Sequence, residues 1–535
     1  MASAPIMLNS IPISVMAKGS HLARLASTSA NDKVLILIQM HGGNDGLNTI
    51  IPVDQYAEYY NLRPNIAIPD NGPRKYIHLD SSLPIENQVG IHPDMESIKE
   101  LYDRARVSIV QGISYENANG SHFRSRDVMF MGGSFDDYFD SGWMGRYLDH
   151  EFPGYPEAYP SPSMPDPLAI EFGSNISLAF HRPIGIPTAV SIPANENFFD
   201  LEQSISGLPP DSIDDTHYGD ELRYILDMEE KTFQYGDRLR SVYQAGGNAS
   251  VEYPTTYPFN APPGRQTSSF YQQLKIIAQL LAGGCKTKIF LTKIGGFDTH
   301  ADQVTQFDST MGNHAALLYF ISTAVQAFQK DLQARGLEEQ VLTMTLTEFG
   351  RRAASNGSFG TDHGNAAPML IFGKNVNPGV IGSAPDLTNL NYGNLTMQYD
   401  YRQVYASVVK DWFEADDSAI QASRFGDWID NRLPIIGNGI TATKESFIKD
   451  RFHLKNCYPN PVKDFTTISF MINRESDVLL RIIDIKGREV KRIDAVVKHA
   501  GEQSIRVDLT GLKPGTYIYE INSGTFKESK KLIKL

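Results

Sequence analysis

The feature that most restricts the possible fold of this sequence is a dense apolar run near the start of the chain, Val34–Ile38 (VLILI). A strand without a polar face has to be covered on both sides, as in the parallel sheets of α/β proteins. The run leads into residues 41–46 (HGGNDG), a glycine-rich turn at the carboxyl end of the predicted strand. Open α/β sheets bind their ligands at that edge. His41 and Asp45 are therefore the first candidate site residues.

Helix-like and strand-like segments alternate over most of the chain. The predicted helices cover residues 95–105, 268–281 and 315–334, and the predicted strands cover 107–112, 288–294, 341–347 and 369–372. This alternation predicts an α/β fold with a doubly wound, mostly parallel sheet. Residues 150–265 are rich in Pro, Tyr and Asn, and we expect a cap or long insertion there, with a helix near 220–243.

The length of 535 residues exceeds one ordinary hydrophobic core, and we expect two domains. Residues 33–440 would form the α/β domain and residues 441–456 a linker. Residues 457–535 alternate apolar and polar residues in short runs between Gly and Pro turns, which predicts a small C-terminal antiparallel β-sandwich. Residues 1–32 are interpreted either as the remainder of an export signal or as a disordered leader.

Composition excludes several classes of protein. The formal net charge is −13 and no basic stripe is present, so we expect no nucleic-acid partner. The only cysteines, Cys285 and Cys457, are far apart, which excludes a disulfide framework and a cysteine-based zinc site. No apolar run reaches the roughly 18 residues that cross a bilayer, so we expect no transmembrane segment.

Two further turns place reactive side chains next to predicted elements. Ser121 precedes a predicted helix, where free backbone N–H groups favour an anion and would assist a nucleophilic hydroxyl. The alternative for Ser121 is an ordinary N-cap serine. Asp298 and His300 follow the strand predicted at 288–294, where they can bind one cation or hydrogen-bond to each other.

The ends of the last two predicted strands carry similar groups. Glu348 follows the strand predicted at 341–347, and Asp362 with His363 precedes the strand predicted at 369–372. Carboxylates and imidazoles would therefore gather at the ligand-binding edge of the sheet.

Nearby arginines could bind an anion. Arg124, Arg126, Arg351 and Arg352 can supply a guanidinium fork for a phosphate or sulfate group, with structural ion pairs as the alternative. His314, at the start of a predicted helix, is expected in a cap or on a packing face.

These segments together resemble the DUF1501 family, which belongs with the alkaline phosphatase and sulfatase superfamily. The residues that carry the resemblance are GGNDGLNT at 42–49, SHF at 121–123, FDTH at 297–300, TEFGR at 347–351 and GTDHG at 360–364. The resemblance spans roughly residues 33–435. It implies an alkaline-phosphatase-like sheet with a two-metal site, in which Ser, Thr or formylglycine attacks phosphorus or sulfur.

The resemblance also implies roles for individual residues, with Ser121 in the position of the nucleophile. The positions that resemble metal ligands are Asp298, His300 and His363 for one cation, Glu348 for the other, and His41 or Asp45 from the first strand, with His122 and Asp362 as further site residues. Arg124 and Arg351 would bind the anion.

Two departures from the superfamily pattern limit these expectations. The superfamily's Asp-His pair appears here as Glu348-Phe349, so a second metal would lose an imidazole and we expect one cation. The formylglycine signature, a Cys or Ser closely followed by Pro and Arg, is absent around Ser121, which favours phosphate over sulfate esters. Zn, Mn, Mg and Ca suit the candidate ligands about equally.

The C-terminal region resembles the type A sorting domain of the type IX secretion system of Bacteroidetes. The matching segments are YPNP at 458–461, DIKGR at 484–488, LTGLKPGTY at 509–517 and KKLIKL at 530–535. The resemblance implies export through the periplasm to the cell surface or the medium, with the secretion machinery as a partner. The alternative is a carbohydrate-binding sandwich.

The sequence therefore predicts a secreted, metal-dependent hydrolase of phosphate or sulfate esters, with Ser121 as nucleophile and a small molecule or polymer as substrate. The alternative is a catalytically inactive, surface-displayed binding or scaffold protein that keeps the fold. The Phe349 replacement supports this alternative.

Overall fold

The computed structural model describes residues 7–8, 11–12, 31–185, 187–195, 216, 235–249, 251–437, 453–454, 457–472, 476–497, 501–523 and 526–535. These residues belong to two compact units, which are residues 1–379 with 387–438, and residues 380–386 with 439–535. Most of the expected leader (1–32) and of the expected linker (441–456) lies outside the described residues.

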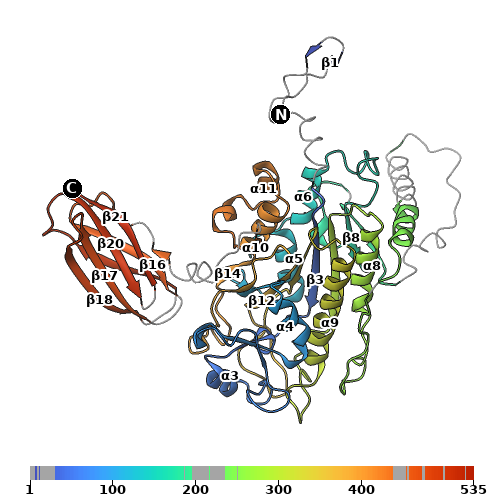
Figure 1. The fold of residues 1–535 in the computed structure, drawn as a ribbon, viewed down its shortest axis with the longest axis horizontal. Helices are drawn as coiled ribbons and strands as arrows, with labels where there is room; N and C mark the ends of the chain where they lie inside the picture. Colours follow the sequence, from blue (N-terminus) through green and yellow to red (C-terminus); the bar gives the residue numbers. More distant parts are fainter. Residues whose placement is uncertain are drawn as a thin grey trace. The chain divides into compact units, whose positions relative to one another are not determined.

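The larger unit is built on a mostly parallel sheet, and the apolar run of the first strand lies at its centre (Figure 1). Strand β3 (Val34–His41) pairs in parallel with β10 (Ile289–Gly295) on one side and with β11 (Val341–Leu346) on the other. Every residue of β3 except His41 is buried, and β11 is buried throughout. Burial on both faces explains why these strands show no polar alternation.

The sheet continues outward from these three strands. The order through its centre is β7-β12-β11-β3-β10-β8-β9, and the outer strands are β7 (Val107–Ser114), β12 (Ala367–Phe372), β8 (Ala169–Phe172) and β9 (Ala189–Ile192), with β14 (Tyr399–Asp400) beside β7. Only β12 runs antiparallel to its neighbours among these strands. The predicted fold class, a mostly parallel α/β sheet, is confirmed.

Helices pack against the sheet in two groups. One group is formed by α4 (Glu96–Asp103), α8 (Phe270–Ala282) and α9 (Asn313–Ala334), where α9 contacts both of the others (Figure 1). The other is formed by α5 (His122–Met131), α6 (Trp143–Glu151) and α11 (Asp417–Ala422), where α6 contacts both of the others. The long helices lie within a few residues of their predicted positions.

Residues 150–265 differ from the expected insertion in one respect. Strands β8 and β9 fall within this range and extend the central sheet in parallel with β10. Each strand has only four residues, and Glu171 and Ser191 interrupt their apolar pattern, so neither strand has a clear signal in the sequence. The helix expected near 220–243 lies largely outside the described residues.

A small lobe follows the first turn of the larger unit. It contains α2 (Gly46–Thr49), α3 (Tyr56–Leu62), the 3-10 turns Ile85–Asn87 and Pro93–Met95, and a three-stranded sheet of β4 (Ile50–Pro52), β6 (Val89–Ile91) and β5 (Ile77–His78). Its core includes Leu47, Ile51 and Tyr59. The remaining described elements of the unit include α10 (Tyr401–Ser407).

The smaller unit is the predicted antiparallel β-sandwich. One sheet contains β15 (His453–Leu454), β16 (Phe465–Ile472) and β19 (Gly501–Asp508), and the other contains β18 (Glu489–Val497), β17 (Ser476–Asp484), β20 (Gly515–Ser523) and β21 (Phe526–Lys534). Both sheets contribute to one core, with Phe470, Leu480 and Tyr519 fully or almost fully buried. Strands β18 and β21 carry many charged residues, so the sequence pattern does not indicate that they are strands.

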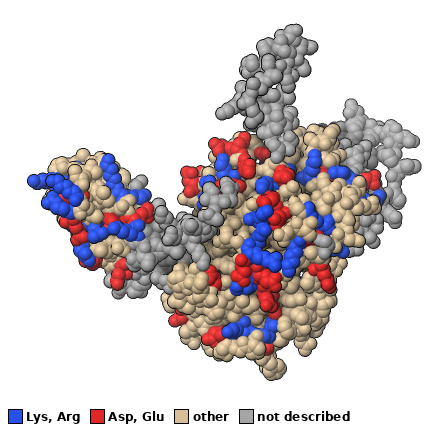
Figure 2. Space-filling model, viewed as in Figure 1, with Lys and Arg blue, Asp and Glu red and all other residues tan. Residues whose placement is uncertain are grey.

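Positive and negative side chains are interspersed over the visible face of the larger unit (Figure 2). Within the part of the chain that the structure describes, no helix combines the length and the apolar character that a membrane span requires.

Candidate metal centre

Three strand ends build the candidate site at the carboxyl edge of the sheet. Because β3, β10 and β11 run parallel, the turns that follow them meet at one edge. Gly295 at the end of β10 pairs with His41 at the end of β3, and Asn44 bridges to Gly350 beyond β11. The residues predicted at this edge are therefore brought together by the topology.

The buried Arg351 ties these turns to one another. Its side chain is fully buried and donates to Asp298 Oδ1 at 2.6 Å. Its other hydrogen bonds go to the backbone carbonyls of Gly42, Gly43, Phe297 and Thr361. In this arrangement Arg351 has no free pair of N–H donors for the predicted binding of an anion, because its guanidinium hydrogen-bonds to groups of the protein itself.

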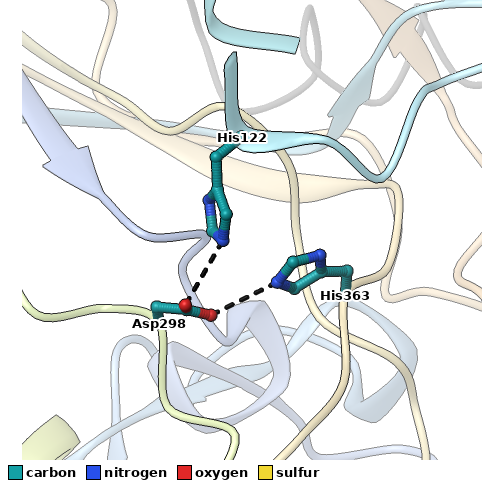
Figure 3. Close-up of side chains that lie close together, drawn as sticks. All are labelled: His122, Asp298 and His363. Carbon is teal, nitrogen blue, oxygen red and sulfur yellow. Dashed lines mark hydrogen bonds and ion pairs between the residues drawn. The ribbon is translucent and has the colours of Figure 1, made fainter. Parts of the chain in front are cut away.

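Four side chains converge in front of these turns. The side-chain ligand atoms of His122, Asp298 and His363 all lie within 4.8 Å of one another (Figure 3). His122 Nε2 lies 3.4 Å from Asp298 Oδ2, and His363 Nε2 lies 3.2 Å from Asp298 Oδ1. His300 joins them, since its Nε2 lies 3.2 Å from Asp298 Oδ1 and 2.9 Å from His363 Nε2.

The other ring nitrogen of each imidazole, Nδ1, lies at hydrogen-bond distance from an oxygen atom. The Nδ1–O distances are 2.7 Å from His363 to the Gly120 carbonyl, 3.2 Å from His300 to Asp362 Oδ1, and 2.9 Å from His122 to Glu348 Oε1. A carbonyl or carboxylate oxygen only accepts, so a neutral ring that donates to it from Nδ1 has a lone pair on Nε2. Histidines that bind metals in proteins are commonly oriented in this way.

The electrostatics of Asp298 and His363 favour the forms of these two groups that bind cations. Burial raises the pKa of Asp298, but the hydrogen bond and the charge of Arg351 outweigh it, and this pKa falls to about 2. Burial lowers the pKa of His363, and this effect exceeds the opposite effect of its bond to Gly120. A deprotonated carboxylate and neutral imidazoles are the forms that bind cations.

Phe349 forms an apolar wall of the site. Its buried ring lies 4.8 Å from the ring centroid of His122 and 4.5 Å from that of His363. It therefore fills space beside the cluster where the superfamily pattern implies an imidazole for a second cation.

Glu348 hydrogen-bonds to His122 and is not one of the four converging side chains. Its side chain is fully buried, and Oε1 accepts hydrogen bonds from the Gly42 N–H at 2.8 Å and from His122. Oε2 is buried and has no hydrogen-bond partner among the described residues. A cavity of about 10 Å³ next to Glu348 approaches the roughly 10–15 Å³ that one water molecule requires.

His41 lies beside the cluster. Its ring centroid is 6.2 Å from that of His122, and its Nδ1 is 3.5 Å from Glu348 Oε1. Burial lowers the pKa of His41, although the charge of Glu348 acts in the opposite direction. His41 therefore lies next to Glu348 and outside the group around Asp298.

Asp45 has a structural environment. Its carboxylate accepts two hydrogen bonds from Arg63, at 2.8 and 2.7 Å, and one from Gln303 at 2.6 Å, and both ion-pair partners are buried. Burial raises the pKa of Asp45, but Arg63 and its other partners lower it further, so the group stays ionised. The structure does not bring Asp45 into the metal cluster.

Ser121 is the N-cap residue of α5 and is exposed, and its hydroxyl makes no capping hydrogen bond. It precedes His122, so the predicted nucleophile lies at the rim of the cluster. Arg124 donates to the carbonyls of Phe135 and Asp137 and lies over the Tyr138 ring at 4.0 Å. Its guanidinium therefore supports a loop.

Some features of the site have little or no signal in the sequence. The Gly120 carbonyl is a backbone atom that any residue type would supply. His314, expected in a cap or packing role, is fully buried with its Nε2 3.0 Å from Asn44 Oδ1, and burial lowers its pKa to about 4. Only proximity in the fold shows that His122 joins Asp298, because these residues are 176 positions apart.

Two family models match the chain. Residues 248–417 match the model described as a protein of unknown function (DUF1501), and residues 456–535 match the secretion system C-terminal sorting domain. The predicted resemblance to DUF1501 is confirmed over residues 248–417, which is part of the predicted range, and the predicted resemblance to the sorting domain is confirmed over residues 456–535. The sorting domain marks the protein for type IX export to the cell surface or the medium.

Several solved structures are similar to parts of the chain. PorU from Porphyromonas gingivalis shares 24% identity over 16% of this chain, with a TM-score of 0.14, and the match covers 9% of the length of PorU. A protein of the alkaline phosphatase superfamily from Vibrio parahaemolyticus shares 10% identity over 85% of this chain and 83% of its own, with a TM-score of 0.27.

The lipoteichoic acid synthase LtaP from Listeria monocytogenes shares 9% identity over 66% of this chain and 69% of its own, with a TM-score of 0.28. No curated protein matches the sequence.

Proposed function

We propose that the chain is an exported, metal-dependent hydrolase of phosphate or sulfate esters with one divalent cation, held by Asp298, His122, His300 and His363. The observation that carries the proposal is the convergence of three Nε2 atoms on one carboxylate, with a separate oxygen holding each ring at Nδ1. Lone pairs at hydrogen-bond distance repel each other unless a proton or a cation lies between them. A single cation would satisfy His122, Asp298 and His363, whose ligand atoms all lie within 4.8 Å of one another, and His300 would be the fourth ligand.

The donor set favours some cations over others. Three imidazoles and one carboxylate suit Zn²⁺ and other transition metals, whereas Mg²⁺ and Ca²⁺ prefer oxygen ligands. When bound, such a cation would stabilise negative charge on an ester oxygen and lower the pKa of a bound water. The side chains of Asp298 and His300 are 47% and 46% exposed, which leaves the cluster open to a substrate.

Ser121 supplies the nucleophile in this proposal. Its position supports the role, because it is exposed, lacks a capping bond and precedes His122 at the start of α5. Attack of Ser121 Oγ on phosphorus or sulfur would form a bond between Oγ and that atom. It would break the bond between the same atom and the oxygen of the leaving alcohol. The proton lost by the serine would balance the proton gained by the alcohol, and water would then release the acid.

A turnover screen tests this proposal. The Zn²⁺-loaded full chain would be assayed with a phosphomonoester, a phosphodiester and a sulfate ester, with and without chelator. We expect chelator-sensitive turnover that Ser121→Ala abolishes without changing the metal content. Ser163→Ala, which removes another exposed hydroxyl, is the matched control and should keep full activity. Full turnover by Ser121→Ala would exclude Ser121 as nucleophile.

A surface-displayed binding protein is the second candidate function. Two observations favour it. Two of the predicted anion-binding arginines, Arg124 and Arg351, donate to groups of the protein itself, and Phe349 fills the space beside the cluster. A protein that holds one cation tightly but turns over none of the three ester classes would favour this function over the hydrolase.

A further inference from the structure

One face of strand β10 carries exposed polar positions beside the cluster around Asp298. Side chains alternate between the two faces along a strand, and residues paired in a parallel register share a face. Gly295 pairs with His41 and Lys293 pairs with Gln39, so these four positions lie on one face of the sheet. Lys293 is exposed although β10 lies between β3 and β8, so solvent reaches the sheet on this face.

The space beside Gly295 is open. A Cβ atom at this position would meet no atom within 4 Å. Lys293 is two residues away along the strand, or about 7 Å. On the other side, His41 is in register with Gly295, and its ring centroid lies 6.2 Å from that of His122. The opening beside Gly295 therefore lies between the Lys293 position and the edge of the candidate metal centre.

Lys293 and Gln39 carry donors that no described residue uses. The Lys293 ammonium makes no ion pair with a described carboxylate. Gln39 is 4% exposed, and its buried Nε2 has no hydrogen-bond partner among the described residues. A buried amide without a partner is costly, which favours a ligand or a water that accepts from it. Both groups donate, so the complementary ligand is an acceptor.

The basic side chains around the opening favour an acceptor with negative charge. Burial is the main cause that lowers the pKa of His41, and the positive charges of Lys293 and Arg126 lower it further. Arg126 is four residues after His122 on α5, so both lie on the same face of this helix. Arg126 also pairs with Asp127 at 3.0 Å, but both side chains are partly exposed and such pairs are weak.

Glu171 is the acidic residue of β8 on the same face. It pairs with Leu291, which is two residues further from the sheet edge than Lys293. Burial raises the pKa of Glu171, and its Oε2 accepts hydrogen bonds from the N–H and the hydroxyl of Ser177, at 2.8 and 3.0 Å. Glu171 therefore does not pair with Lys293 and lies on the side of it away from Gly295.

We propose that Lys293 binds a phosphate or sulfate group in the opening beside Gly295, with the Gln39 amide as a further donor, directly or through a water. Ammonium and amide groups donate to the oxygens of such anions. Binding of the oxyanion does not depend on hydrolysis. The deeper assignment rests on the proposed hydrolase function: the oxyanion is a second anionic group of the same substrate, so the preferred ester carries at least two such groups.

Calorimetric titration of the metal-stripped full chain with inorganic phosphate and with sulfate tests the site without the cation. We expect saturable binding of at least one of the two anions. Lys293→Gln should weaken this binding about tenfold or more, because it removes charge-assisted hydrogen bonds. Gly295→Val should weaken it at least as much, because its side chain would fill the opening, where a Cβ atom meets no atom within 4 Å.

Two variants elsewhere in the chain are matched controls. Lys330→Gln changes a lysine on α9 that contacts Glu100 at 3.8 Å, and Gly236→Val adds a side chain where a Cβ atom also meets no atom within 4 Å. Both should bind the anion as the unchanged chain does. Absence of saturable binding, or unchanged binding by either Lys293→Gln or Gly295→Val, would overturn the site.

A second experiment separates a free oxyanion from a substrate group. In the metal-loaded chain, Lys293→Gln should raise the KM of a bisphosphate ester about tenfold more than that of a monophosphate ester. An equal change for both would overturn the substrate assignment and leave the opening as a site for free oxyanion. Absence of turnover with every ester would contradict the hydrolase function, while the calorimetric result would still decide the oxyanion site.

Discussion

His300 and His363 face each other through their Nε2 atoms, 2.9 Å apart, while Asp298 Oδ1 lies 3.2 Å from both. In an ordinary pair of histidines one ring donates to the other. Here Asp362 and Gly120 offer acceptors to the Nδ1 atoms, and rings that donate to them direct two Nε2 lone pairs at the same point. We expect this relationship of two ligands that share one cation.

Removal of one imidazole should weaken cation binding sharply. We expect His363→Ala to lower the affinity for Zn²⁺ more than about 100-fold, because even the residues that orient metal ligands contribute 10–100-fold. Competition with a chromophoric chelator would measure the affinity. His150→Ala, which alters a histidine on α6 that contacts Ser418 Oγ at 3.0 Å, is the matched control. Equal affinities for the two variants would contradict the assignment of His363.

The carboxylate behind His300 should matter less than the ligand itself. Asp362→Ala removes the acceptor for His300 Nδ1, so we expect a 10–100-fold loss of Zn²⁺ affinity with little change in melting temperature. Asp362→Asn keeps an acceptor oxygen and should recover most of the loss. If alanine and asparagine weaken binding equally, orientation of His300 is not the role of this residue.

The turn after β3 should tolerate no side chain at Gly42. This residue has φ of +124°, and a Cβ atom there would overlap with the backbone of Phe297 and Asp298. Gly42→Ala should therefore displace the Asp298 loop and lower Zn²⁺ affinity at least about tenfold. Gly72→Ala introduces similar backbone strain at φ +86° but meets no atom within 4 Å, so its cation binding should be unchanged.

The buried ion pair of Asp45 and Arg63 should control stability rather than cation binding. Asp45→Asn leaves Arg63 buried without its anionic partner, and we expect a cost of about 3–5 kcal/mol in the free energy of unfolding. Denaturant titration measures this cost. Asp103→Asn, which breaks an exposed pair with Lys99 on α4, should cost less than about 1 kcal/mol.

The same pair predicts a pH dependence. The folded-state pKa of Asp45 lies below its ordinary value of 3.8, so the stabilisation is fully present above pH 3.8 and is lost as the pH falls through the folded-state pKa. The difference in stability between the unchanged chain and Asp45→Asn should therefore shrink below pH 3.8. A constant difference down to pH 2 would contradict this account of Asp45.

The sequence indicates much of the fold because the central strands have unusually clear signals. Val34–Ile38 could only be a strand covered on both faces, and the 22-residue helix α9 is predicted to within two residues at each end. Strands β8 and β9 are not expected from the sequence, since four residues with one polar position carry too little pattern. Tertiary pairing with β10, rather than local preference, makes them strands.

The site was predictable to the extent that parallel strands bring their carboxyl ends together. Asp298 and His300 follow the parallel strand β10, whereas His363 precedes the antiparallel strand β12, whose amino end lies at the same edge. The different surroundings of Asp45 and Glu348 could not be read from the sequence, because they depend on contacts with Arg63, 18 residues away, and with His122, 226 residues away. Both carboxylates follow strands, and only the fold shows which interactions they make.

Metal analysis of the purified full chain tests the central claim most directly. The protein would be stripped with chelator, incubated with Zn²⁺, passed through a desalting column and analysed by elemental mass spectrometry. We expect about one Zn²⁺ per chain in the unchanged protein and close to none when His122, His300 and His363 are all replaced by alanine. Two cations per chain, or none in the unchanged protein, would contradict the single site built around Asp298.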